Sequence, residues 1–221
     1  MKPIDSPNIY HIYNRGVEKR NIFLEEKDYL RFLASLYRFN DTKPTFNFDR
    51  LPKLFGVELR TVEPLVKICA FCLMPNHFHL ILRALRENGI TEFMRKIGTG
   101  YTNFFNLKYQ RVGPLFQGKY KAKILSNQAH FLYLPYYIHL NPLDLITPNW
   151  KNSGIGDIDK TYNFLINYRW SSLPDYLGRK HFPNLTSTEL FKGLISADSI
   201  KNHLRDLKNA DFSTIQDIVF D

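Results

Sequence analysis

Two histidines in the pentapeptide Asn76-His77-Phe78-His79-Leu80 could hold a metal ion. Side chains of a strand alternate between its two faces, so His77 and His79 would point the same way while Phe78 points into a core. Imidazole is a suitable ligand for divalent metals. The tripeptide His-x-His is common, however. On its own, this tripeptide is at least as well explained by two histidines on a half-exposed strand that bind nothing as by a metal site.

A tyrosine and an asparagine, 60 residues further along, could complete such a site. Residues i and i+4 share one face of a helix, so Tyr137 would lie beside Asn141, whose amide oxygen can ligate a hard metal. Neither Tyr133 nor Tyr136 has a ligating side chain one turn later. The spacing therefore favours Tyr137 as a nucleophile and Asn141 as a third ligand. An ordinary amphipathic helix, with Tyr137 packed and Asn141 capping its end, remains an open alternative.

The distribution of charge indicates a polyanionic partner. The formal net charge is +9, and no acidic residue lies between Glu92 and Asp144, a gap of 51 residues. Aromatic residues are interleaved with the cations of this stretch. Lysine and arginine neutralise phosphates and aromatic rings can stack on unpaired bases, so the pattern favours nucleic acid over a merely solvated basic face. The seven cations are Arg95, Lys96, Lys108, Arg111, Lys119, Lys121 and Lys123.

Length and composition are those of a globular protein. A chain of 221 residues can bury one sizeable core, with a small C-terminal appendage. No apolar run approaches the roughly 18 residues of a membrane span, and the N-terminus lacks the apolar core of a signal peptide. Cys69 and Cys72 would face opposite sides of one strand, which argues against a disulfide. We expect a cytoplasmic, nucleoid-associated protein of bacterial type, with no membrane partner, as a monomer or homodimer.

The periodicity of apolar residues predicts an α+β fold. The order of elements is β-α-β-β-α-β-α, a ferredoxin-like split βαβ arrangement with an antiparallel sheet and helices on one face. Ser126 is the expected N-cap of the last of these helices, and Pro142 its stop. A loop over 40–64, with a helical turn near 51–55, interrupts the order, and a polar helix is expected over 199–209. Strands are expected over 9–13, 66–73, 77–83 and 120–125, and helices over 25–39, 90–109 and 126–141.

Two segments carry a resemblance to a known family. Cys72-Leu73-Met74-Pro75-Asn76-His77-Phe78-His79-Leu80 and Tyr137-Ile138-His139-Leu140-Asn141-Pro142 are similar to the signature segments of the REP-associated tyrosine transposases. That family belongs to the HUH single-tyrosine transposase superfamily. The resemblance covers roughly residues 8 to 178, and its segments occur in the expected order. The further matching pieces are Tyr13-Asn14-Arg15-Gly16, Tyr101-x-x-Phe104-Phe105-Asn106, Gly113-Pro114-Leu115-Phe116-Gln117-Gly118 and Arg169-Trp170-Ser171-Ser172.

The resemblance implies a fold, a metal, a nucleophile and a substrate. It implies an HUH endonuclease or transposase domain over 1–148, with 149–221 as a C-terminal extension. It implies a Mg²⁺ or Mn²⁺ site made by His77, His79 and Asn141, with Tyr137 as the nucleophile. The substrate would be single-stranded DNA with hairpins, cleaved and rejoined through a 5′-phosphotyrosine.

The chain departs from the family pattern in three places, at the long loop 40–64, at 149–167, and at Pro135, which should kink the nucleophile helix. Arg15, Lys19 and Arg20 follow the first strand and are candidate hairpin phosphate contacts. The other histidines are expected to be surface or supporting groups.

Three other functions could use the same residues. A nucleotide hydrolase of the histidine-triad kind needs a third alternating histidine, but position 81 is Ile81. A zinc site made by Cys69, Cys72 and the two histidines would need both cysteines on one side, usually on a turn. The remaining alternative is a catalytically idle or domesticated protein that binds hairpin DNA with the same fold.

Overall fold

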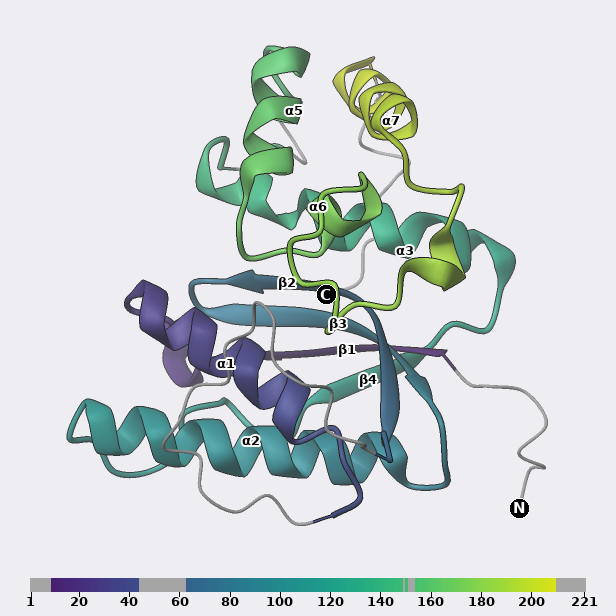
Figure 1. The fold of residues 1–221 in the computed structure, drawn as a ribbon. Helices are drawn as coiled ribbons and strands as arrows, with labels where there is room; N and C mark the ends of the chain where they lie inside the picture. Colours follow the sequence, from purple (N-terminus) through teal and green to yellow (C-terminus); the bar gives the residue numbers. More distant parts are fainter. Residues whose placement is uncertain (1–8, 44–62, 149, 151–153, 210–221) are drawn as a thin grey trace.

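A four-stranded antiparallel sheet forms the centre of the molecule (Figure 1). The computed structural model describes residues 9–43, 63–148, 150 and 154–209. The strands lie in the order β2-β3-β1-β4, and every neighbouring pair is antiparallel. Their bounds are β1 Ile9–Arg15, β2 Val66–Met74, β3 His77–Ala84 and β4 Lys121–Ile124.

The helices complete the predicted order. They are α1 Glu26–Arg38, α2 Gly89–Lys108, α3 Gln128–Leu140, α5 Ile158–Asn167, α6 Leu173–Tyr176 and α7 Ala197–Asn209. Short 3-10 helices lie at η1 Val17–Lys19, η2 Asn141–Leu145 and η3 Thr188–Phe191. The sequence β1-α1-β2-β3-α2-β4-α3 confirms the predicted ferredoxin-like α+β fold. Most of the predicted loop 40–64, including the helical turn near 51–55, lies outside the described residues.

Each face of the sheet is covered by its own layer. Helices α1 and α2 lie on one face, where Phe32 and Tyr101 pack against Phe78 and Leu80 of β3. Helix α3 lies on the other face with the C-terminal helices α5 and α7 beside it (Figure 1). The sheet is therefore buried on both sides. The predicted arrangement with the helices on one face holds for the crossover helices α1 and α2, whereas α3 covers the opposite face.

Strand β1 is longer than the sequence indicates. The sequence predicts a turn at Asn14-Arg15-Gly16, but β1 continues to Arg15 because Asn14 pairs with Phe78 and Arg15 with His77. The chain then turns through Gly16, where a Cβ atom would lie 2.3 Å from the carbonyl oxygen of Arg20. A glycine is needed at this position because any side chain would collide with that backbone.

Helix α3 begins one residue later than predicted. Asn127, not Ser126, is the N-cap, because its side chain accepts a hydrogen bond from the backbone N–H of His130 at 2.8 Å. The helix continues through Pro135 to Leu140 without interruption. The α-helix ends at Leu140 with Asn141 as its C-cap, directly before Pro142 as predicted, and the 3-10 helix η2 follows with Pro142 in its first turn.

The C-terminal segment fixes α3 against β2. The Ser172 hydroxyl lies 2.9 Å from Nε2 of His139 and accepts a hydrogen bond from the backbone N–H of Phe71. The Tyr136 hydroxyl donates to the carbonyl of Leu194 at 2.7 Å. Trp170 stacks on Tyr29 of α1, with the ring centroids 4.4 Å apart. The motif containing Trp170 and Ser172 is thus a packing element that connects both layers.

Candidate active site

The register of the sheet brings the two histidines next to polar residues of β1. Tyr13 pairs with His79 on one side and with Lys121 on the other, and Arg15 pairs with His77. Directly paired residues in an antiparallel sheet project from the same face. His77, His79, Tyr13 and Lys121 therefore all project toward α3.

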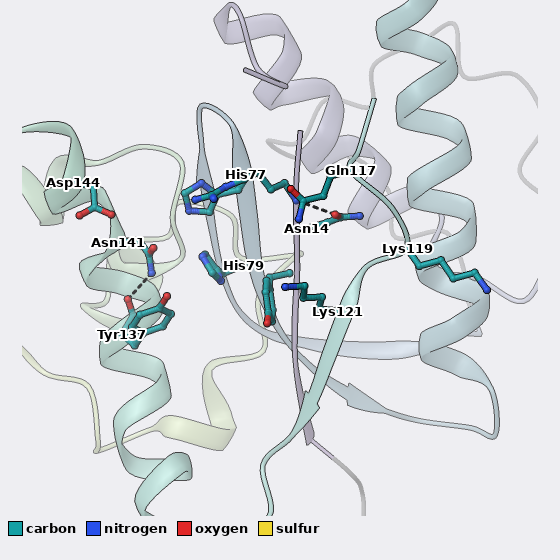
Figure 2. Close-up of a pocket in the computed structure, with 11 residues that line it drawn as sticks. Asn14, His77, His79, Gln117, Lys119, Lys121, Tyr137, Asn141 and Asp144 are labelled. Atoms are coloured by element: carbon teal, nitrogen blue, oxygen red, sulfur yellow. Dashed lines mark hydrogen bonds between the residues drawn. The ribbon is translucent and has the colours of Figure 1, made fainter. Parts of the chain in front are cut away.

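These side chains line a pocket between the sheet and α3 (Figure 2). Its volume is about 370 Å³. Tyr137 and Asn141 enter from the helix, the two histidines come from the start of β3, and Lys121 enters from β4. The lining residues are Tyr13, Asn14, Arg15, His77, His79, Gln117, Lys119, Lys121, Tyr137, Asn141 and Asp144.

Tyr137 is the tyrosine of α3 that faces the histidines. Its ring lies edge-on to that of His79, with a centroid distance of 5.6 Å and an interplanar angle of 84°. Tyr136 turns toward the C-terminal segment instead and stacks on His203 at 4.7 Å. Tyr133 packs between Tyr137 and His203. The helical register predicted from the spacing is therefore the one the structure has, despite Pro135.

Asn141 joins the end of α3 to the pocket. Its amide Nδ2 donates to the carbonyl oxygen of Tyr137 at 2.8 Å, which caps the helix as in the purely structural alternative (Figure 2). The same bond fixes which way the amide points, so that Oδ1 is the atom available to a ligand in the pocket. Capping and metal ligation are thus compatible roles for this one side chain.

Both histidines use the Nδ1 side of the ring for hydrogen bonds. Nδ1 of His77 lies 2.6 Å from Oδ1 of Asn76, and Nδ1 of His79 lies 2.9 Å from Nε2 of His11. His11 is fully buried. Burial, together with the nearby positive charge of Lys123, lowers the pKa of His11 to about 3, so its ring is neutral near pH 7.

The donor set fits a divalent cation. Two imidazole Nε2 atoms and one carboxamide oxygen are acceptable ligands that leave coordination positions for substrate oxygens. Within the described part of the chain, no group of three or more His, Cys, Asp or Glu residues is placed to hold a metal. The residues that would hold a metal in this pocket are the predicted His77, His79 and Asn141, and Asp144 lies in the same lining.

The predicted DNA contacts divide into a group at or near the pocket and a group on the α1/α2 side of the sheet. Arg15, Lys119 and Lys121 line the pocket, and Lys123 lies two residues further along β4, paired with His11. Lys19 and Arg20 follow β1, and Arg20 pairs with Glu18 at 3.3 Å. A positive rim at the pocket suits a phosphate backbone.

The cations of α2 and the following turn lie on the opposite layer. Lys96 contacts Glu92 at 2.8 Å and the carbonyl of Asp41 at 2.5 Å. Lys108 forms ion pairs with Glu25 at 2.7 Å and with Asp28 at 2.5 Å. Arg111 donates to Asn106, and Arg95 is exposed. The acid-free stretch is thus not one continuous basic surface.

Several residues that line the pocket or lie behind it were not among the predicted site residues. His11 and Tyr13 alternate with Arg15 along β1, and this period of 2 is the signal that could have grouped them. Gln117 lies in the Gly113–Gly118 segment, which pairs with the end of β1 through the bond from the Gln117 N–H to the Arg15 carbonyl. Asp144 brings the one carboxylate in the lining and lies three residues after Asn141.

The two cysteines do not lie as predicted. Both are unbridged and buried. A β-bulge between Ile68 and Ala70 shifts the alternation of β2, so Cys69 and Cys72 belong to the same core cluster instead of opposite faces. The expectation of opposite faces was wrong because a bulge adds one residue to the strand.

The comparisons with known proteins agree with this geometry. Residues 62–141 match the family described as transposase IS200 like, a range that includes both histidines, Tyr137 and Asn141. One solved structure that matches is described as "Structure of the REP associates tyrosine transposase bound to a REP hairpin". Its TM-score is 0.50 at 11% identity, over 86% of this chain and 91% of that chain. No curated protein gave a match. The resemblance to the tyrosine transposases is confirmed, and the structural likeness shows their fold.

The helices among the described residues do not suit a bilayer. None of them has both the length and the apolar character required to cross a membrane.

Proposed function

We propose that this protein cleaves and rejoins single-stranded DNA near hairpins, with Tyr137 as the nucleophile. The observation that carries the proposal is the position of Tyr137. Its ring faces His79 across a pocket that contains Arg15, Lys119 and Lys121. A tyrosine that faces a histidine, in a pocket lined by two histidines and three cations, suits attack on a phosphodiester. The match to IS200-like transposases supports the same chemistry.

The cations would hold the DNA strand in the pocket. Arg15, Lys119 and Lys121 can contact successive phosphates, while the partly exposed ring of Tyr13 offers a surface for an unpaired base. The solved relative is bound to a REP hairpin. We extend that partner to this chain, so that a hairpin would present the adjoining single strand to the pocket.

The bond changes follow from the chemistry of tyrosine. The Oη atom of Tyr137 attacks the phosphorus, and the bond from phosphorus to the 3′ oxygen breaks. The phenol proton leaves to solvent and the departing 3′ oxygen gains a proton. The product is a 5′-phosphotyrosine and a strand with a free 3′-hydroxyl. Attack of another 3′-hydroxyl on the phosphotyrosine reverses the step, so rejoining needs no external energy source.

A divalent ion, Mg²⁺ or Mn²⁺, would polarise a phosphate oxygen and stabilise the negative charge that develops there. His77, His79 and Asn141 would hold it. Asn141 also caps α3, so the residue that would bind the ion positions the helix that carries the nucleophile.

The test is the capture of a covalent adduct. The protein is incubated with Mn²⁺ and a hairpin-bearing single strand labelled at its 3′ end, and the denatured protein is examined for label. We expect labelled wild-type protein, and release of a shorter strand when the label is at the 5′ end. Tyr137→Phe should bind the strand and carry no label.

Two neighbouring tyrosines provide matched controls. Tyr136→Phe loses only a hydrogen bond to the carbonyl of Leu194, and Tyr133→Phe changes a packed ring. Both variants should still form the adduct. An adduct that survives Tyr137→Phe but not Tyr136→Phe would mean that the nucleophile is Tyr136 and that the proposal is wrong. Hairpin binding without any adduct would favour the idle DNA-binding protein.

A further inference from the structure

The hydrogen bonds behind the two histidines decide which ring nitrogen each one offers to the pocket. A neutral imidazole has one N–H and one nitrogen lone pair, and only the lone pair can bind a metal. The partner of one nitrogen therefore determines the state of the other. In this chain the two partners are Asn76, in the β2–β3 turn, and His11, in β1.

At His77 the direction of the hydrogen bond follows from the amide of Asn76. Nδ2 of Asn76 donates to the carbonyl oxygen of Lys19 at 3.3 Å, so Oδ1 is the end that faces His77. A carboxamide oxygen only accepts hydrogen bonds. Nδ1 of His77 must therefore carry the proton, and Nε2 of the neutral ring carries the lone pair.

At His79 the partner is a second imidazole. The rings of His11 and His79 lie within 20° of one another, and one N–H joins Nε2 of His11 to Nδ1 of His79 at 2.9 Å. If His79 donates, its Nε2 presents a lone pair. If His11 donates, the proton of His79 lies on Nε2, where it blocks a metal. The fully buried His11 is hydrogen-bonded to the pocket through His79, and its ring also contacts those of Tyr13 and Tyr137.

We propose that Asn76 and His11 are positioning residues that hold His77 and His79 in the Nδ1–H tautomer. Both Nε2 lone pairs are thereby presented to the pocket that Asn141 also lines. The metal-binding consequence rests on the proposed function, whereas the tautomers can be observed without metal or DNA. In many metal sites a carboxylate or a backbone carbonyl accepts this hydrogen bond and orients the ring. In this chain the acceptors would be a carboxamide and an imidazole.

The first experiment measures the tautomers directly. Metal-free protein labelled with ¹⁵N at histidine is studied above pH 7 by long-range ¹H–¹⁵N correlation, which distinguishes Nδ1–H from Nε2–H rings. We expect both His77 and His79 as Nδ1–H. His11→Phe should shift His79 toward Nε2–H, and Asn76→Leu should do the same to His77. An Nε2–H ring at either position in the wild type would overturn the proposal.

Conservative variants separate positioning from simple disruption. His11→Gln and Asn76→Asp each keep an oxygen that can accept the Nδ1 proton, so the Nδ1–H tautomer should return. His139→Phe is the matched control, because His139 is as deeply buried as His11 but bonds Ser172 instead of a pocket histidine. It should leave the tautomer of His79 unchanged. Asn76 lies in a partly exposed turn, so Asn76→Leu should fold even if His11→Phe does not.

The second experiment measures Mn²⁺ affinity in the absence of DNA, by the loss of the free-ion electron paramagnetic resonance signal. Loss of a group that orients a metal-bound histidine typically weakens affinity about 10- to 100-fold. We expect that range for His11→Phe and Asn76→Leu, with recovery in His11→Gln and Asn76→Asp. Unchanged affinity in a variant whose tautomer has switched would refute the positioning role. Tight Mn²⁺ binding with no DNA adduct would refute the proposed reaction alone.

Discussion

The two faces of the sheet each bury a polar cluster, and the clusters are built differently. On the α1/α2 face, the Asp28 carboxylate is fully buried and accepts hydrogen bonds from Lys108 at 2.5 Å and Tyr109 at 2.7 Å. It also accepts from the backbone N–H groups of Leu24 and Glu25. The side-chain contacts join the start of α1 to the end of α2, and the backbone contacts cap α1, so the cluster is structural.

On the α3 face, the buried cluster continues into a pocket. His11 is as buried as Asp28, but its hydrogen bond leads to His79, which lines the pocket with His77 and Tyr137. The comparison shows that burial and hydrogen bonding do not by themselves mark a functional group. The two clusters differ in what their hydrogen bonds reach: those of Asp28 stay within the protein, whereas that of His11 leads to a residue that lines a cavity.

The largest expected effect is on the α3 face. His77→Ala removes one of two imidazoles at the pocket and should abolish adduct formation, with an unchanged circular dichroism spectrum because His77 is only partly buried. Addition of a chelator to the wild type should give the same result. Adduct formation by His77→Ala in chelator-treated buffer would disprove a metal role for this pair.

The next effect is on the opposite face and concerns stability. Asp28→Asn removes the negative charge that faces Lys108 and should lower the free energy of unfolding by about 3 kcal/mol, measured by urea denaturation. The adduct should still form at temperatures where the variant is folded. A folded Asp28→Asn protein that makes no adduct would show that the two clusters are not separate.

A smaller effect should distinguish the cations of the two faces. Charge reversal of Lys119 and Lys121, which line the pocket, should weaken hairpin binding and reduce the slope of log affinity against log salt by about 1 to 2. Reversal of Arg95 and Lys96 on α2 should leave that slope nearly unchanged. Equal slopes for both double variants would mean that the pocket cations do not contact phosphates.

The smallest effect concerns pH. Burial lowers the pKa of His139 to about 3. The unfolded chain therefore binds the extra proton first, and stability falls as pH decreases below about 6.5 toward 3. His139→Gln should reduce the loss between pH 6 and pH 5 by about 1 kcal/mol in urea titrations. A pH profile identical to that of the wild type would contradict this.

Local patterns in the sequence determine much of the fold. The alternation in His77-Phe78-His79 and the i, i+4 spacing of Tyr137 and Asn141 are short-range relations, fixed by the geometry of a strand and a helix. These two side-chain arrangements are the same in any fold that contains such a strand and such a helix. The structure accordingly has the predicted order of elements, and Tyr137 turns toward His79 although Pro135 lies in the same helix.

Relations between distant segments were decided only by the tertiary structure. The hydrogen bond between His11 and His79 depends on the register of β1 against β3, which no local pattern specifies. The same holds for Lys108, which belongs to a basic stretch in sequence but to the Asp28 cluster in space. The sequence by itself determined which residues could do the chemistry, because type and spacing are local. Only the packing of distant strands and helices decided which side chains face a pocket and which are satisfied within the core.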